Sequence, residues 1–130
     1  MKLFGTAVLV VCAVYCAPPM RADSVSPVSG HDMYMSYCAS CHGRDGKGNG
    51  PVAASLKTAP ADLTMLSARN NGQFPEKRVY GTIRGNVRVA SHGSAEMPVW
   101  GHIFEKMGDS AQAQMRLSNL VSYLRSIQSK

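Results

Sequence analysis

Apolar side chains recur at steps of three and four residues in three stretches of the chain, residues 30–39, 74–84 and 109–127. The recurring positions are Met33, Tyr34, Tyr37, Val79, Tyr80, Ile83, Leu117, Leu120, Val121, Leu124 and Ile127. That spacing places apolar side chains on one face of a helix. A short helix is also expected within residues 60–69, and no stretch shows the sustained alternation of a strand. The pattern predicts an all-α protein with about four to five short helices.

Residues that start and stop helices flank the second and third stretches. Pro75 suits a first helical turn, where its missing N–H costs nothing, and Gly85 suits a helix end. Asp109 and Gln112 have the spacing of a capping pair. Residues 86–93 are predicted to form a loop.

A glycine-rich segment covers residues 43–51. Its spacing matches neither the dinucleotide-binding fingerprint nor the P-loop, and no predicted strand precedes it. The segment is therefore expected to be a tight surface turn rather than a phosphate site.

The beginning of the chain has the pattern of a secretory signal. Lys2 precedes an uncharged run over residues 3–17, and small and polar residues follow it. We expect residues 1–22 to be a signal peptide, residues 23–29 a flexible leader, and residues 30–130 one domain, exported to the periplasm or a similar compartment. A membrane anchor is the alternative if the segment is not cleaved, although a run of about 15 residues is short for a transmembrane helix.

The net charge indicates only which classes of partner are compatible with the surface. The chain carries a net charge of +6, and removal of Lys2 and Arg21 with the signal peptide lowers it to +4. A mildly basic surface is compatible with acidic protein partners. Lysine and arginine do not cluster with aromatic residues, so nucleic acid is not an expected partner.

The cysteines carry the strongest chemical signal. After removal of residues 1–22 only Cys38 and Cys41 remain, and His42 follows directly. Cys-x-x-Cys-His is the attachment signature of haem c. On a helix these three side chains share one face, so both thiols can add to vinyl groups of the porphyrin while the imidazole approaches the iron.

Two other interpretations of Cys38 and Cys41 are weaker. A thioredoxin-type redox pair belongs near a strand–helix–strand pattern, which the sequence lacks. A structural zinc site needs further ligands, and the exported part of the chain has no second cysteine pair.

Residues 38–42 and their flanks, together with four other segments, follow a known family pattern. These segments are Tyr37-Cys38-Ala39-Ser40-Cys41-His42-Gly43, Asp45-Gly46-Lys47-Gly48-Asn49-Gly50-Pro51, Ala59-Pro60-Ala61-Asp62-Leu63, Met97-Pro98-Val99-Trp100-Gly101 and Leu120-Val121-Ser122-Tyr123-Leu124-Arg125. In them the chain resembles the class I cytochromes c over residues 30–128. The resemblance implies the class I fold around one covalently attached haem c with its iron.

The resemblance also implies roles for individual residues. His42 would be the proximal axial ligand and Met97 the distal one, and Cys38 and Cys41 would form the thioethers. The carbonyl of Pro60 would accept the Nδ1 proton of His42.

Further positions follow from the same pattern. Gly30 and Tyr34 would pack across Leu120 and Tyr123. Trp100 would lie near the haem edge, where its N–H could meet a propionate.

Some assignments stay open at this stage. His92 is the alternative to Met97 as distal ligand. Arg78, Arg84 and Arg88 are candidate partners of the haem propionates, with no basis for choosing among them.

The function implied is electron transfer rather than catalysis, because two filled axial positions leave none for oxygen or peroxide. Partners would be redox proteins such as a periplasmic dehydrogenase, oxidase or reductase. If Met97 is not bound, a five-coordinate haem enzyme or sensor acting on peroxide or a small gas is the alternative. A haem subunit of a larger respiratory complex is another.

Overall fold

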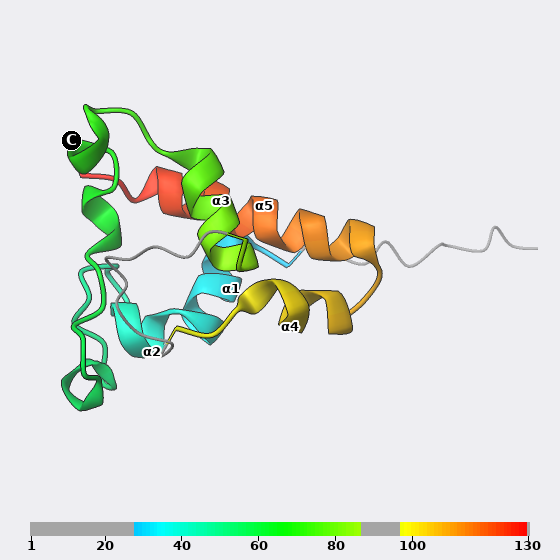
Figure 1. Cartoon of the computed structure of the whole chain (residues 1–130), viewed down its shortest axis with the longest axis horizontal. Coiled ribbons are helices and arrows are strands. Elements are labelled where there is room, and N and C mark those ends of the chain that lie inside the picture. Colours follow the sequence, from blue (N-terminus) through cyan, green and yellow to red (C-terminus); the bar gives the residue numbers. More distant parts are fainter. Residues whose placement is uncertain (1–27, 87–96, 130) are drawn as a thin grey trace, which may run out of the picture.

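Helices account for the regular structure of residues 28–86 and 97–129, the part of the chain that the computed structural model describes (Figure 1). The α-helices are α1 (Gly30–Tyr37), α2 (Ala39–His42), α3 (Glu76–Arg84), α4 (Trp100–Lys106) and α5 (Ser110–Ser126). Single 3₁₀ turns form η1 (Ala53–Ser55), η2 (Leu63–Met65) and η3 (Ala68–Asn70). These described residues contain no strand, and the predicted all-α class is confirmed.

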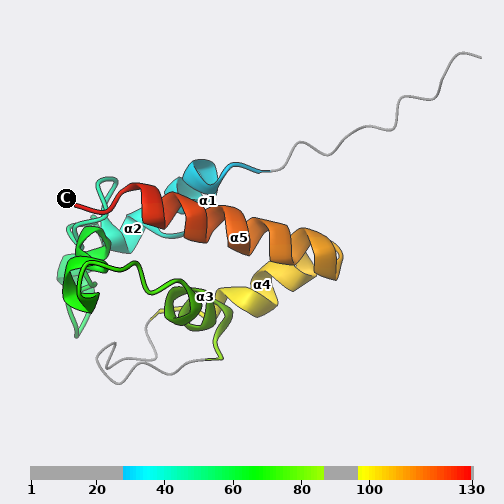
Figure 2. The same ribbon diagram turned by 90° about the horizontal axis from the view of Figure 1, so that it is seen from above.

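Helix α5 is the element against which the other long helices pack. It contacts α1 on one side and α3 and α4 on the other (Figure 2). The most deeply buried side chains lie at these contacts: Met33, Tyr34, Phe104, Leu120 and Val121. The helical spacing in the sequence therefore did mark the buried face of α1, α3 and α5.

The crossing of α1 and α5 depends on a glycine. A Cβ added at Gly30 would overlap the carbonyl oxygen of Asn119 and lie 2.9 Å from the Cβ of Tyr123. One turn further along α1, the ring of Tyr34 lies 5.2 Å from that of Tyr123. The expected packing of Gly30 and Tyr34 on this part of α5 is thus observed.

Helix ends follow the predicted signals in part. Gly85 ends α3 in the left-handed conformation (φ 91°), and its N–H donates to the carbonyl of Gly81 at 3.0 Å. Pro75 is the residue before the first helical turn of α3. Asp109 caps α5, since its carboxylate accepts from the Gln112 N–H at 2.8 Å.

Three local expectations differ from the structure. The helix expected over residues 30–39 ends at Tyr37, because the chain turns at Cys38 (φ −115°) before α2 begins. Residues 60–69 form the separate turns η2 and η3, since the Asp62 carboxylate accepts from both the N–H and the hydroxyl of Thr64 and so favours a tight turn. Helix α4 was not predicted from the sequence.

Several sequence predictions fall outside the described residues. They are the signal peptide over residues 1–22, most of the leader, most of the 86–93 loop, Arg88 and His92. Within residues 28–86 and 97–129, no helix is long and apolar enough to cross a membrane.

Candidate functional site

Residues 38–42 form one helical turn. The N–H groups of His42 and Cys41 both donate to the carbonyl of Cys38, at 2.9 and 3.2 Å. Side chains three and four residues apart on such a turn project to the same side. Cys38 and Cys41 are half-buried thiols with no disulfide between them, and His42 is buried. The structure therefore brings the three predicted residues together on one face.

The glycine-rich segment folds back over the end of this turn. Gly48, Gly50 and Val52 donate their N–H groups to the carbonyls of His42, Cys41 and Ser40, at 2.7, 3.1 and 3.0 Å. These are carbonyls that the end of a helix leaves without intrahelical partners. The segment predicted as a surface turn therefore also holds the Cys-x-x-Cys-His turn in shape.

The imidazole of His42 is oriented by a backbone carbonyl. Its Nδ1 lies 2.9 Å from the carbonyl oxygen of Ala61, and His42 as a whole is only 8 % exposed. Because a carbonyl can only accept, Nδ1 is the donor in this bond, and in the neutral imidazole Nε2 then carries the lone pair available to a metal.

The sequence analysis expected the carbonyl of Pro60 to accept this proton. In the structure the acceptor is the carbonyl of the next residue, Ala61. The carbonyl of Pro60 lies instead against Gly48, where a Cβ would overlap it. The close approach of the 43–51 segment to residues 60 and 61 sets which carbonyl faces the imidazole. Sequence spacing alone does not indicate whether Pro60 or Ala61 accepts the hydrogen bond from His42.

Tyr34 ties the turn to α1. Its hydroxyl donates to the carbonyl of Gly43 at 2.6 Å, and both residues are buried. Burial raises the pKa of the Tyr34 hydroxyl, so it remains a donor at any physiological pH.

We expect Tyr34→Phe to lower the free energy of unfolding by about 0.5–1.5 kcal/mol, because the buried Gly43 carbonyl would lose this bond and keep only the Gly46 N–H at 3.2 Å. Denaturant unfolding of the variant measures this. Tyr37→Phe is the matched control, since the Tyr37 hydroxyl makes only a 3.8 Å contact with the Met107 sulfur at an exposed position. Equal losses for the two variants would contradict the role assigned to Tyr34.

The protonation of Cys38 bears on the thioredoxin-type alternative. Burial, with a smaller contribution from Cys41, raises the pKa of the Cys38 thiol to about 12. A dithiol redox site instead lowers the pKa of its attacking cysteine to generate a thiolate. The environment of Cys38 does not suit that chemistry.

A structural zinc site would need further ligands beside the Cys38–His42 turn. Over residues 28–86 and 97–129, no three His, Cys, Asp or Glu side chains come together in a way that could hold a metal ion.

The other predicted site residues lie on α4 and just before it. Met97 is half-buried and packs on the hydrophobic core. Trp100 begins α4 and stacks on Phe104, with centroids 6.0 Å apart, and lies 5.3 Å from Tyr37. This aromatic cluster fixes α4 against the end of α1, next to Cys38.

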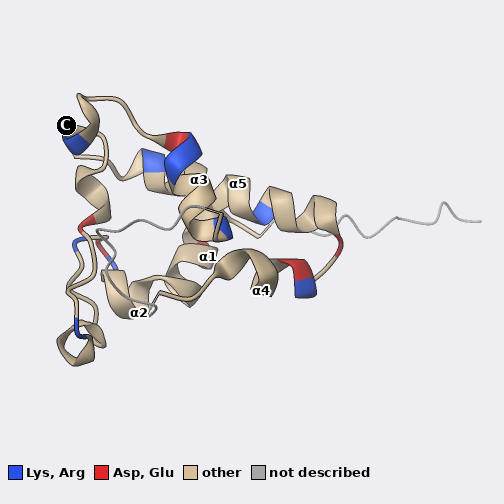
Figure 3. Ribbon diagram, viewed as in Figure 1, with Lys and Arg blue, Asp and Glu red and all other residues tan. Residues whose placement is uncertain are grey.

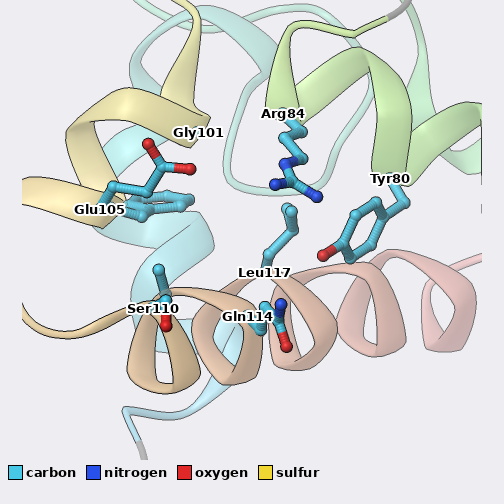
Figure 4. Close-up of a pocket in the computed structure, with 9 residues that line it drawn as sticks. Tyr80, Arg84, Gly101, Glu105, Ser110, Gln114 and Leu117 are labelled. Carbon is cyan, nitrogen blue, oxygen red and sulfur yellow. The ribbon is translucent and has the colours of Figure 1, made fainter.

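A cleft of about 220 Å³ lies between α3, α4 and α5 (Figure 4). Tyr80 and Arg84 reach into it from α3, above Leu117 of α5. The predicted attachment and ligand residues, Cys38, Cys41, His42 and Met97, do not line this cleft. Of the arginines considered for propionates, Arg84 lines the cleft, and Arg78 contacts the Asn70 amide at 3.5 Å.

The residues around the Cys38–Cys41 turn fit a covalently attached haem. The donor set has two half-buried thiols and one imidazole whose lone pair is on Nε2. Partly buried apolar side chains from the segments that follow the turn pack on the core and could flank a flat apolar ring: Leu63, Leu66, Phe74, Tyr80, Met97 and Trp100.

Comparison with known proteins agrees with this fit. The family model described as cytochrome c oxidase, cbb3-type, subunit III matches residues 26–115, which is more than half of the chain and includes the Cys-x-x-Cys-His turn and Met97. No curated protein and no solved structure gives a match.

The match determines the cofactor class and the general function. A cytochrome c domain carries covalently bound haem c with its iron, and its chemistry is haem-based electron transfer. The chain accordingly belongs to the cbb3-type cytochrome c oxidase subunit III family and is a c-type cytochrome.

Proposed function

We propose that the protein carries single electrons between redox proteins through one haem, held by Cys38 and Cys41 and ligated by His42 and Met97. The observation that carries this proposal is the Cys38–His42 turn itself. It presents two half-buried thiols and a buried imidazole on one face, and the Ala61 carbonyl holds the imidazole in the tautomer that a metal ligand needs. When bound, the haem supplies an iron that alternates between two oxidation states.

The protein's own groups prepare the proximal side. Donation from Nδ1 to Ala61 fixes the ring plane of His42 and raises the basicity of Nε2. The three N–H bonds from Gly48, Gly50 and Val52 keep the turn from unwinding. A site that moves little on a change of oxidation state suits fast electron transfer.

Met97 is the proposed distal ligand. It precedes Pro98 in a non-helical segment, lies half-buried beside the core, and is followed by the Trp100 cluster that anchors α4. A thioether ligand favours the reduced state. If His42 and Met97 both hold the iron, no position on it would remain open for oxygen or peroxide, so we propose a carrier rather than an enzyme.

The surface beside Met97 suits a docking partner. Three exposed apolar residues follow one another at every fourth position, with Ile103 in α4 and Val99 and Met107 at its two ends. Charged side chains on α4 are confined to its end, at Glu105 and Lys106, and α2 carries none (Figure 3). Interface centres are depleted in charge in this way.

We infer that the partner is a membrane oxidase complex or an exported dehydrogenase or reductase. The description of the matched family, a subunit of a cbb3-type oxidase, supports the first. Export to the periplasm, with residues 1–22 cleaved and residues 30–130 as the working domain, belongs to the same proposal.

A spectrum of the Met97→Ala holoprotein tests the ligation. The wild type should give sharp low-spin bands on reduction and, when oxidised, the weak far-red band of an iron–methionine bond. We expect Met97→Ala to lose that band, while Met115→Ala, at a position 45 % exposed on α5, keeps it.

Other spectra would point elsewhere. A wild-type low-spin spectrum without the far-red band would favour His92 as the ligand. A high-spin wild-type spectrum would mean an open axial position, and the protein would then be tested as a peroxide- or gas-binding haem protein.

A further inference from the structure

The side chain of Gln128, just beyond α5, is bonded to a segment more than fifty residues away. Its Oε1 accepts from the N–H of Ser67 at 2.8 Å. Its Nε2 donates to the carbonyls of Leu63 and Leu124, both at 2.7 Å. One neutral amide thereby closes the end of α5 and fastens it to residues 63–67.

The chemistry of the three partners fixes the orientation of this amide. Leu63 and Leu124 offer carbonyls, which only accept, and Ser67 offers an N–H, which only donates. A flipped amide would lose all three bonds. The neighbouring Ser129 N–H adds a fourth connection, to the carbonyl of Thr64 at 2.9 Å. Figures 1 and 2 both show the segment after α5 running along the 63–70 region.

Residues 62–67 are held from their other side by the glycine-rich segment that follows His42. The N–H of Leu63 donates to the carbonyl of Gly46 at 2.7 Å. Asp62 accepts from the N–H and hydroxyl of Thr64, which is only 6 % exposed. Residues 62–67 are therefore clamped between the loop that follows His42 and the end of α5.

Ala61 is the residue immediately before this clamped segment, and its carbonyl accepts from Nδ1 of His42. The position of that carbonyl depends on where residues 62 and 63 are held. Gln128 reaches Leu63 directly, two residues from the acceptor. Gln128 also lies beyond residues 26–115, the part of the chain that the family model matches.

We propose that Gln128 is a positioning residue for His42, which sets the hydrogen bond to Ala61 and thereby tunes the reduction potential. The inference rests on the proposed function, in which His42 ligates the iron. A firmly held acceptor strengthens the Nδ1–H bond and raises the basicity of Nε2. A more basic ligand stabilises the oxidised iron, so loosening the clamp raises the potential.

Gln128→Met in the full-length holoprotein is the test, because it keeps side-chain length, adds no charge and removes all three bonds. We expect the midpoint potential to rise by up to about 59 mV. At a fixed ambient potential this rise lowers the oxidised-to-reduced ratio about tenfold for one electron. Amide exchange at Leu63, Ser67 and Ser129 should become faster. Gln114→Met is the matched control, since Gln114 is exposed on α5 and lies far along the helix from residues 63–67.

Gln128→Asn is a milder variant, because it keeps the amide group on a side chain that is one methylene shorter. Its midpoint potential should also rise, but by less than that of Gln128→Met. Faster exchange with an unchanged potential would overturn the proposal, since Gln128 would then be only structural. Unchanged exchange and potential would overturn it too. A wild-type spectrum without low-spin iron would overturn the proposed ligation, and this inference with it, before any Gln128 variant is compared.

Discussion

Replacing Cys38 and Cys41 together by alanine is expected to give a protein without covalent haem and largely unfolded. A domain of this size buries a modest core, so a tightly held apolar cofactor contributes a large share of its stability. The partly buried residues that would flank the ring would lose their packing partner: Leu63, Leu66, Phe74, Tyr80, Met97 and Trp100. Haem staining after denaturing electrophoresis measures attachment, and far-ultraviolet circular dichroism measures helix content.

Ser40→Ala is the control for the double cysteine variant. Ser40 lies between the two cysteines and is exposed, so its replacement should leave attachment and helix content unchanged. A double variant that purifies as a stable helical protein would contradict the expectation, because it would show that the polypeptide core suffices for folding.

Gly30→Val is expected to lower the free energy of unfolding by roughly 3 kcal/mol, at the upper end of overpacking effects. Any Cβ at this position overlaps the carbonyl oxygen of Asn119 on α5, which is helix backbone and cannot rotate away. The α1–α5 crossing must then open, and that crossing buries Tyr34 and Leu120 completely. Denaturant unfolding of the holoprotein measures the loss.

Ser36→Val tests whether the Gly30 effect comes from the crossing rather than from valine in α1. Ser36 is exposed on the same helix, and its change should cost only a few tenths of a kcal/mol through helix propensity. Similar losses for the two variants would mean that Gly30 is not needed for the close approach.

The elements that sequence predicted well are those set by local spacing. The steps of three and four in α5 place Leu117, Leu120, Val121 and Leu124 on one face, and all four are buried. The Cys-x-x-Cys-His spacing fits within one helical turn, so local spacing alone predicts that its three side chains share one face. Gly85 ended α3 as predicted because a left-handed helix end strongly favours glycine.

The predictions that missed depend on contacts between distant segments. Helix α4 has seven residues, too few to be stable by propensity, and it forms where Trp100 and Phe104 meet Tyr37 of α1. The break at Cys38 follows the same logic, since the direction of α2 is tied by Tyr34 and the returning glycine loop.

The sequence by itself determined the all-helical class, the buried face of the longer helices, and the candidate haem-binding residues at positions 38, 41 and 42. Each depends on spacing within one or two helical turns. Only the tertiary structure decided that Ala61 rather than Pro60 faces His42, and that Gln128 fastens the segment beside it. Those choices are made by hydrogen bonds between residues 19 and 65 positions apart, and such pairings have no local periodicity from which they could be read.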